Sequence, residues 1–451
     1  MLNLQQLGQL TKREGFVKYF KNTSWLFAEK LLRLVSGLVV GVLVARYLGP
    51  SDYGLYNYAF SVVAIFSAVA ALGLNQIVVR ELVKHQDQSQ VLLGTAFYLK
   101  LAGTILSMCF VIATIFVIDK DAETRMLVIV IALSVVFTSF NVVDYYFQSK
   151  IESKFLLYSN MISISVAAAI KVYLVFFEGS LLAFAWVVVI ENALLAIGLV
   201  YYFIRESGKI PLIDWQFSGH IAKSLMKDSW PLVFGGLVLM IQGKIDQLML
   251  KEMISTEVVG YYSVALRMVE IFGFIPMLLQ NSLMPSLINS KKASPSLYAS
   301  RLTNYYRLNF IFFLLIAAPL AIFSEQIISI LFGESYMAAA ILLTLMSVRL
   351  LFSNMGVARG SFLVIENLNK FSLLTMTIGT IFNVILNLIW IPKYQAIGSV
   401  YATIVSFLVT IFLIDLFHKK ARWNLRLMVK AMLSFYKMRL DFINYDKSGQ
   451  R

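Results

Sequence analysis

Charged side chains lie inside apolar stretches of this sequence that are long enough to cross a membrane. A charge at the centre of a membrane helix costs about 2.5–3.5 kcal/mol, so charges that persist there usually face a substrate or ion pathway. The cations in or at the edge of these stretches are Arg33, Lys171, Lys244, Arg267, Arg349 and Arg359. The acidic residues are Glu29, Asp144, Glu191, Asp246 and Glu270. They are too many for lipid-facing positions, and they predict a hydrated cavity within the membrane.

The balance of these charges indicates what the cavity would bind. The deep cations and the acidic residues are similar in number, and Arg33, Lys100 and Arg359 tip the balance towards positive. A cationic cavity suits an anionic substrate group. The acidic residues would orient the cations or bind a coupling ion, for which H⁺ and Na⁺ are the candidates.

Some of these charges also have a purely structural interpretation. Arg33 could extend to the membrane surface or pair with Glu29 one turn away, instead of facing a cavity. Lys171 and Glu191 lie at similar depths on either side of a predicted hairpin, so mutual neutralisation is the simpler explanation for both. The alternatives remain open at the level of the sequence.

Small residues accompany the intramembrane arginines at helical spacing. Four glycines follow Arg33 or Arg349 on the same helix face, and glycines spaced by four allow close helix approach or leave a shallow groove. A proline in a predicted span interrupts helical hydrogen bonding. The resulting candidate packing or hinge positions are Gly37, Gly41, Pro276, Gly356 and Gly360.

Composition places the chain among polytopic membrane proteins. Of its 451 residues, 59% are hydrophobic and only 14% are charged, against about 45–50% and about 25% in soluble domains. A membrane helix needs about 20 mostly apolar residues. The sequence therefore predicts an all-α integral membrane protein with twelve transmembrane helices, at residues 25–47, 54–74, 91–118, 126–148, 155–177, 181–203, 230–250, 258–282, 303–324, 336–363, 370–390 and 397–417.

Basic residues outside the predicted spans gather on one side of the membrane. The net charge of +14 comes mainly from these loops and from the C-terminal tail. Because lysine and arginine accumulate on the cytoplasmic side of membrane proteins, and because an even number of spans puts both ends on one side, both termini are predicted to be cytoplasmic. The positive charge therefore needs no nucleic-acid partner to explain it.

The longest connection between spans divides the chain into two halves of six. The stretch Gly54-Leu-Tyr-Asn-Tyr-Ala59 opens the second span and Gly260-Tyr-Tyr-Ser-Val-Ala265 opens the eighth, so the two fall at equivalent places. This repeat favours two six-helix bundles related by a pseudo-two-fold axis along the membrane normal. The predicted segments are an interfacial helix at 1–21, bundles at 22–204 and 230–417, a cytoplasmic linker at 205–229 and a basic amphipathic tail at 418–451.

Several classes of chemistry lack their motifs in this sequence. It contains no P-loop and no dinucleotide fingerprint in a strand–helix context. The predicted outer loops are too short to carry a catalytic pair of carboxylates. The only cysteine, Cys109, and three widely separated histidines give no metal-ligand spacing. The chain is therefore predicted not to be an enzyme and to hold no metal.

Three motifs resemble a known family of transporters. They are Glu29-Lys-Leu-Leu-Arg33, Val44-Ala-Arg-Tyr-Leu-Gly-Pro-Ser-Asp-Tyr-Gly54 and Lys244-Ile-Asp-Gln-Leu-Met-Leu250. With these motifs the sequence resembles the polysaccharide biosynthesis flippases, and more narrowly the O-antigen repeat-unit (Wzx-type) flippases. These belong to the multidrug/oligosaccharidyl-lipid/polysaccharide (MOP) superfamily. The resemblance covers all twelve predicted spans, and the Ala-Arg-Tyr-Leu-Gly-Pro block is its most specific part.

The resemblance implies a MATE-like fold without enzymatic activity. It implies translocation of an undecaprenyl-diphosphate-linked oligosaccharide, an O-antigen or similar unit of lipopolysaccharide biosynthesis, from the cytoplasmic to the periplasmic leaflet of the bacterial inner membrane. Alternating access through a cationic lumen would move this substrate, and membrane lipid and other glycan assembly proteins are the further partners implied. The alternatives are an ion-coupled multidrug antiporter of the same superfamily and a membrane glycan polymerase or glycosyltransferase.

Overall fold

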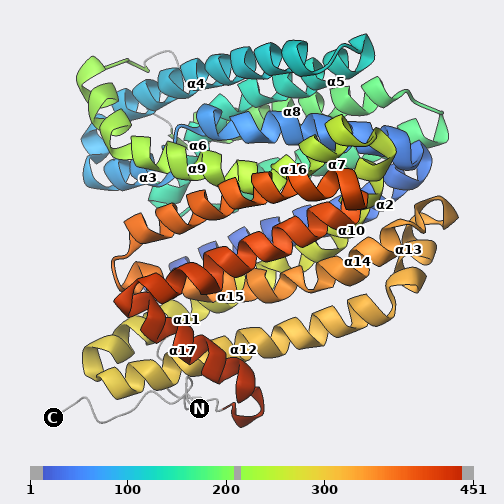
Figure 1. Cartoon of the computed structure of the whole chain (residues 1–451). Helices are drawn as coiled ribbons and strands as arrows, with labels where there is room; N and C mark the ends of the chain where they lie inside the picture. Colours follow the sequence, from blue (N-terminus) through green and yellow to red (C-terminus); the bar gives the residue numbers. More distant parts are fainter. Residues whose placement is uncertain (1–13, 208–214, 439–451) are drawn as a thin grey trace. The chain divides into compact units, whose positions relative to one another are not determined.

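The structure, a computed structural model, describes residues 14–207 and 215–438, with side chains over 24–206 and 215–438. Every regular element within these ranges is helical (Figure 1). The prediction of an all-α protein is thus confirmed for the described part of the chain. The predicted interfacial helix at 1–21 lies outside the described side chains, as do residues 439–451 of the predicted tail.

Within the described ranges, ten helical segments are long and apolar enough to cross a membrane, which supports a multi-pass membrane protein. The twelve predicted stretches fall within these ten segments to within a few residues, because two of the segments each contain two predicted stretches. These two segments are Ser24–Lys84 and Asn369–Phe417. The count of twelve separate spans stays a prediction.

Each of these two long segments is interrupted by a residue with non-helical backbone. Gly49 has φ 72° and ψ 175° and is followed by Pro50, at the predicted Gly-Pro turn. Glycine adopts positive φ without steric cost, and proline lacks the amide hydrogen that a continuing helix would use. In the second segment the interruption is Gln395, with φ 52° and ψ −133°. Gln395 lies in the short gap between the predicted stretches 370–390 and 397–417, although positive φ is uncommon outside glycine and nothing marks this residue within the gap.

By their contacts the helices form two compact units that divide between Leu248 and Met249. The division lies near the end of α9, so α9 groups with the first unit. The predicted linker at 205–229 lies earlier in the chain, and its residues 208–214 fall outside the described ranges. The helices of the first unit are α2 (Glu14–Ala71), α3 (Asn75–Lys84), α4 (Ser89–Ile118), α5 (Ala122–Leu133), α6 (Val142–Lys150), α7 (Lys154–Phe176), α8 (Leu181–Ser207) and α9 (Gly219–Met253).

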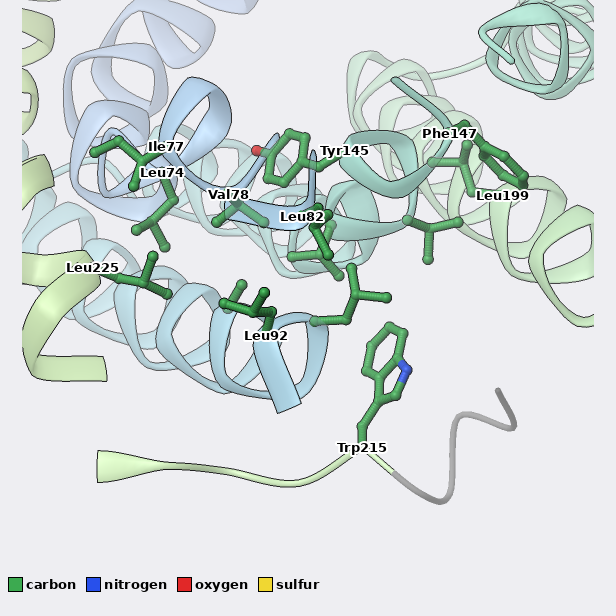
Figure 2. Packing of buried hydrophobic residues seen from close by; sticks show 14 of the residues in the cluster. Leu74, Ile77, Val78, Leu82, Leu92, Tyr145, Phe147, Leu199, Trp215 and Leu225 are labelled. Atoms are coloured by element: carbon green, nitrogen blue, oxygen red, sulfur yellow. The ribbon is translucent and has the colours of Figure 1, made fainter. Parts of the chain in front are cut away.

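A cluster of buried apolar side chains holds the first unit together (Figure 2). Leucine, valine and aromatic side chains from α3, α4, α6 and α8 meet in this cluster. Trp215, the first described residue after the 208–214 gap, joins them, with its ring 5.4 Å from that of Phe97 and 5.7 Å from that of Phe203. These ring contacts fix the chain against α4 and α8 just before α9 begins.

The second unit is built from shorter helices and one long broken helix. Its helices are α10 (Thr256–Glu270), α11 (Phe274–Ala293), α12 (Pro295–Ile322), α13 (Ser324–Phe332), α14 (Ala339–Ser347), α15 (Arg349–Ile365), α16 (Asn369–Leu408) and α17 (Lys419–Leu433). A π-helical turn at Val409–Leu413 and a 3₁₀ turn at Ile414–Phe417 connect α16 to α17. Only His418 separates the last candidate span from α17.

The core of the second unit includes part of the C-terminal helix. Met428 and Ala431 of α17 are fully buried together with Phe352, Met355 and other side chains of α11, α12 and α15. In Figure 1, α17 crosses α12, the helix with which it makes most of its contacts. The apolar stripe of the predicted tail is therefore occupied by protein.

Candidate functional site

The intramembrane charges of the first unit include one arginine that is fixed but half exposed. Arg33 of α2 donates from Nε to Glu29 Oε1 over 3.1 Å and from Nη2 to Asn160 Oδ1 of α7 over 2.6 Å. The side chain of Arg33 is 52% exposed, whereas that of Glu29 is nearly buried. The expected one-turn pairing with Glu29 is thus formed, and it positions the guanidinium while leaving part of it open.

Lys100 lies in the interior of the first unit. Its side chain is 2% exposed, and its Nζ donates to the Tyr145 hydroxyl of α6 over 2.9 Å. That hydroxyl donates in turn to Asn75 Oδ1 of α3. The sequence counted Lys100 among the cations but did not identify these partners, because α3, α4 and α6 are brought together only by the packing of the unit.

Asp144 lies on α6, the helix that also carries Tyr145. Its Oδ2 accepts from Gln148 Nε2 over 2.7 Å, as the i,i+4 spacing of these two residues suggests. Its Oδ1 is buried and has no hydrogen-bond partner in the described part of the chain.

Lys171 and Glu191 neutralise each other. Lys171 Nζ of α7 donates to Glu191 Oε2 of α8 over 3.1 Å, and both side chains are largely buried. This pair confirms the structural interpretation that the sequence favoured. Lys171 is thereby occupied by a carboxylate of its own unit.

Lys244 of α9 is not neutralised in this way. Asp246 and Gln247 are buried, and Gln247 Oε1 accepts from the Ser61 hydroxyl of α2. Lys244, half-buried two residues before Asp246, forms no ion pair within the described residues. The Nε2 of Gln242, one turn from Asp246, is buried without a hydrogen-bond partner in the same set of residues.

In the second unit, Arg359 is fully paired. Its Nε and Nη2 donate to Asp415 Oδ2 and Oδ1 over 2.9 Å and 2.5 Å, and both side chains are buried. Thr375 accepts a longer hydrogen bond from the same guanidinium, which also lies 5.8 Å from the ring centre of Phe371. This geometry gives Arg359 a structural role and lends no support to substrate binding, which stays a prediction.

The partner of Arg359 was missed from the sequence. Asp415 is the only acidic residue in the predicted span 397–417, and the lone deep carboxylate of a span was the signal that could have identified it. No spacing rule links it to Arg359, because the two lie on different helices.

Arg267, Glu270 and Arg349 carry the remaining predicted charges of the second unit. Arg267 and Glu270 do not form an ion pair, although their i,i+3 spacing allows one; Glu270 is exposed and Arg267 half-buried. Arg349 is half-buried with its guanidinium 5.6 Å from the ring centre of Phe407. Within the described residues, neither arginine is neutralised by a carboxylate.

The predicted packing positions have different surroundings. At Gly356 an added Cβ would lie 3.2 Å from Ile411 Cδ1, so this glycine does permit close packing. At Gly37 and Gly360 it would meet no atom within 4 Å, so these two do not mediate close helix contact in this conformation. Pro276 is buried near the start of α11, just after the 3₁₀ turn that separates α11 from α10.

The sequence matches a family described as "Polysaccharide biosynthesis protein" over residues 43–341. This match covers more than half of the chain. The chain belongs to this family. The family shown is the one that the Ala-Arg-Tyr-Leu-Gly-Pro block indicated.

A curated relative extends the similarity to nearly the full chain. The chain is 22% identical over 408 residues to "Capsular polysaccharide biosynthesis protein CapF" of Staphylococcus aureus, and the match covers 89% of this chain and 99% of the relative. This relative is therefore of comparable length and similar along its whole sequence.

Solved structures of transporters share the fold. An inward-facing multidrug resistance MATE family transporter of the MOP superfamily gives a TM-score of 0.69 at 16% identity, covering 88% of this chain and 96% of the other. The "Lipid II flippase MurJ, inward closed conformation" gives a TM-score of 0.67 at 16% identity and covers 92% of each chain. The chain thus has a MATE/MurJ-like fold.

Proposed function

We propose that this protein is a flippase for a lipid-linked oligosaccharide. The proposed substrate is an undecaprenyl-diphosphate-linked repeat unit, carried from the cytoplasmic to the periplasmic leaflet of the bacterial inner membrane with both termini cytoplasmic. The family is one of polysaccharide biosynthesis, and the fold is shared with a lipid II flippase and with drug transporters. These two findings together favour a lipid-linked glycan as cargo.

One structural observation supports the proposal more strongly than the other observations do. Lys244, Arg267 and Arg349 lie on helices of membrane-spanning length, and none of them forms an ion pair in the described part of the chain. An unpaired cation in this setting is costly, so it is retained where an anionic group compensates it. The diphosphate of a carrier lipid is such a group, because it is anionic and accepts several hydrogen bonds.

Arg33 is a further candidate for contact with the diphosphate. Glu29 and Asn160 fix one edge of its guanidinium, while half of the side chain stays exposed. A cation held in this way loses little conformational entropy on binding. Asp246 and Glu270 are the proposed orienting or ion-coupling groups, with H⁺ or Na⁺ as the ion.

The location of lipid-linked oligosaccharide after depletion of the protein tests the proposal. We expect the intermediate to accumulate in the inner leaflet of the cytoplasmic membrane, and re-expression of the protein to restore delivery to the outer leaflet. Normal delivery without the protein would contradict the flippase function. Drug sensitivity measured in the same cells tests the alternative of a multidrug antiporter. This alternative is based on the MATE transporter, whose fold is as similar to that of this chain as the fold of MurJ is.

A further inference from the structure

The helix α17 is fixed to the second unit by contacts along one of its faces. Tyr306 of α12 donates from its hydroxyl to Asn424 Oδ1 over 2.8 Å, and both residues are fully buried. Glu366 accepts from Lys420 Nζ over 3.0 Å. Arg307 donates to the Ser434 hydroxyl just beyond the helix over 2.8 Å. The helix therefore cannot rotate about its axis, and its opposite face points permanently away from the unit.

The opposite face carries cations and apolar side chains in alternation. Residues spaced by three and four along a helix share a face, and those that point away from the buried side of α17 are all exposed. We call them the outer arc: Lys419, Arg422, Arg426, Val429, Lys430 and Leu433. The exposed fraction of Leu433 is 75%, and packing within the unit does not explain why so large an apolar side chain is exposed.

The outer arc holds no acidic residue. The cations of the arc form no ion pair within the described residues, and the sequence from 416 to 440 contains no aspartate or glutamate. Arg422 donates from Nε to the Leu416 carbonyl, which orients it without neutralising it. The arc is thus a patch of uncompensated positive charge interspersed with a valine and a leucine.

The start of α17 places this patch at a membrane surface. The last candidate span ends at Phe417, and α17 begins at Lys419. A helix that starts two residues after a membrane span lies within reach of the lipid headgroups on that side. Amphipathic helices that bind this region combine basic residues with exposed apolar side chains, which insert at the headgroup boundary.

We propose that the outer arc of α17 is a docking surface for the headgroups of acidic phospholipids. The cations match the negative charge of such headgroups, and Val429 and Leu433 enter the boundary between headgroups and acyl chains. This interaction does not depend on the transported substrate. It would hold for a drug transporter of the same fold as well as for a flippase.

A spin label on the arc tests this assignment. Val429→Cys is labelled in a Cys109→Ser background, and the full-length protein is placed in nanodiscs of phosphatidylcholine alone or of phosphatidylcholine mixed with phosphatidylglycerol. The accessibility of the label to oxygen is compared with its accessibility to a water-soluble nickel chelate. We expect oxygen accessibility to dominate only when phosphatidylglycerol is present, because the charges draw the arc into the interface.

Charge variants identify the responsible side chains. Arg426→Gln/Lys430→Gln should reduce the preference of the label for acidic nanodiscs by about fivefold for each cation removed. The matched control is Lys223→Gln/Lys227→Gln, which neutralises two exposed lysines at the start of α9 and should leave the label unchanged. The proposal would be overturned by a label that stays in water in both lipids or that contacts lipid equally in both. It would also be overturned if the control variant changed the label as much as Arg426→Gln/Lys430→Gln does. The comparison of the two lipids needs no charge variant, so it remains decisive if a variant fails to fold.

Discussion

At the scale of single residues, the intramembrane cations fall into two groups, according to whether a carboxylate neutralises them. Lys171 and Arg359 are neutralised by Glu191 and Asp415. Lys244, Arg267 and Arg349 are not neutralised in the described part of the chain. The sequence identified the cations by their depth in apolar stretches, but their pairing depends on which helices meet, which spacing along the chain does not determine.

The buried pair of Arg359 and Asp415 gives a prediction of stability. Asp415→Asn leaves a buried guanidinium without its counter-charge, which costs about 3–5 kcal/mol in comparable sites. We expect a marked fall in the thermal unfolding midpoint of the purified protein. Glu191→Gln is the control, since its pair with Lys171 is partly exposed and should cost less. An equal fall in the unfolding midpoint for the two substitutions would contradict the prediction that loss of the more deeply buried pair costs more stability.

At the scale of elements, the helices follow from apolar length, and the irregularities follow only in part. The turn at Gly49 was evident because glycine and proline favour it, whereas the break at Gln395 was expected only as the gap 391–396 between two predicted stretches and not as a particular residue. The tail was predicted to be an amphipathic helix at the membrane surface, whereas the apolar stripe of its described part packs on α12 and α15, which leave a buried site for Met428. Whether a helix face is buried depends on helices that are distant in the sequence, so the local pattern of apolar residues does not predict it.

The attachment of α17 predicts a pH dependence. Burial alone would raise the pKa of Glu366, but the hydrogen bonds and charges of Lys291 and Lys420 outweigh it and hold the pKa below its ordinary value of 4.5. A carboxyl whose folded pKa is lowered stabilises the fold above its unfolded pKa, and this contribution is lost as the pH falls through the folded pKa. Glu366 should therefore stabilise the attachment fully at neutral pH and no longer below its folded pKa.

Hydrogen exchange of the α17 amides measures this contribution. At neutral pH we expect faster exchange in Glu366→Gln than in the wild type, and at a pH well below 4.5 we expect the two to exchange equally. Glu325→Gln, at an exposed carboxyl of α13 in the same unit, should behave as the wild type at both values. A difference between Glu366→Gln and the wild type that persists unchanged in acid would contradict the role of the charged carboxyl.

For the whole molecule, composition alone was enough to place the chain in a membrane, and one motif was enough to identify its family. The MATE/MurJ-like fold agrees with the architecture that the motif implied. The cargo is not encoded in the fold, because drug transporters and a lipid II flippase share it. The proposal of an anionic cargo therefore rests on the cations that no carboxylate among the described residues neutralises.

The measurement that tests this claim most directly is glycan export by variants of these charges. Arg267→Ala/Arg349→Ala should abolish export in cells while the protein level stays normal, because both substitutions remove cations that no carboxylate of the described ranges neutralises. Lys171→Met/Glu191→Leu removes a cation together with its partner and should retain export. Wild-type export by the arginine variant, at the same protein level, would contradict the account.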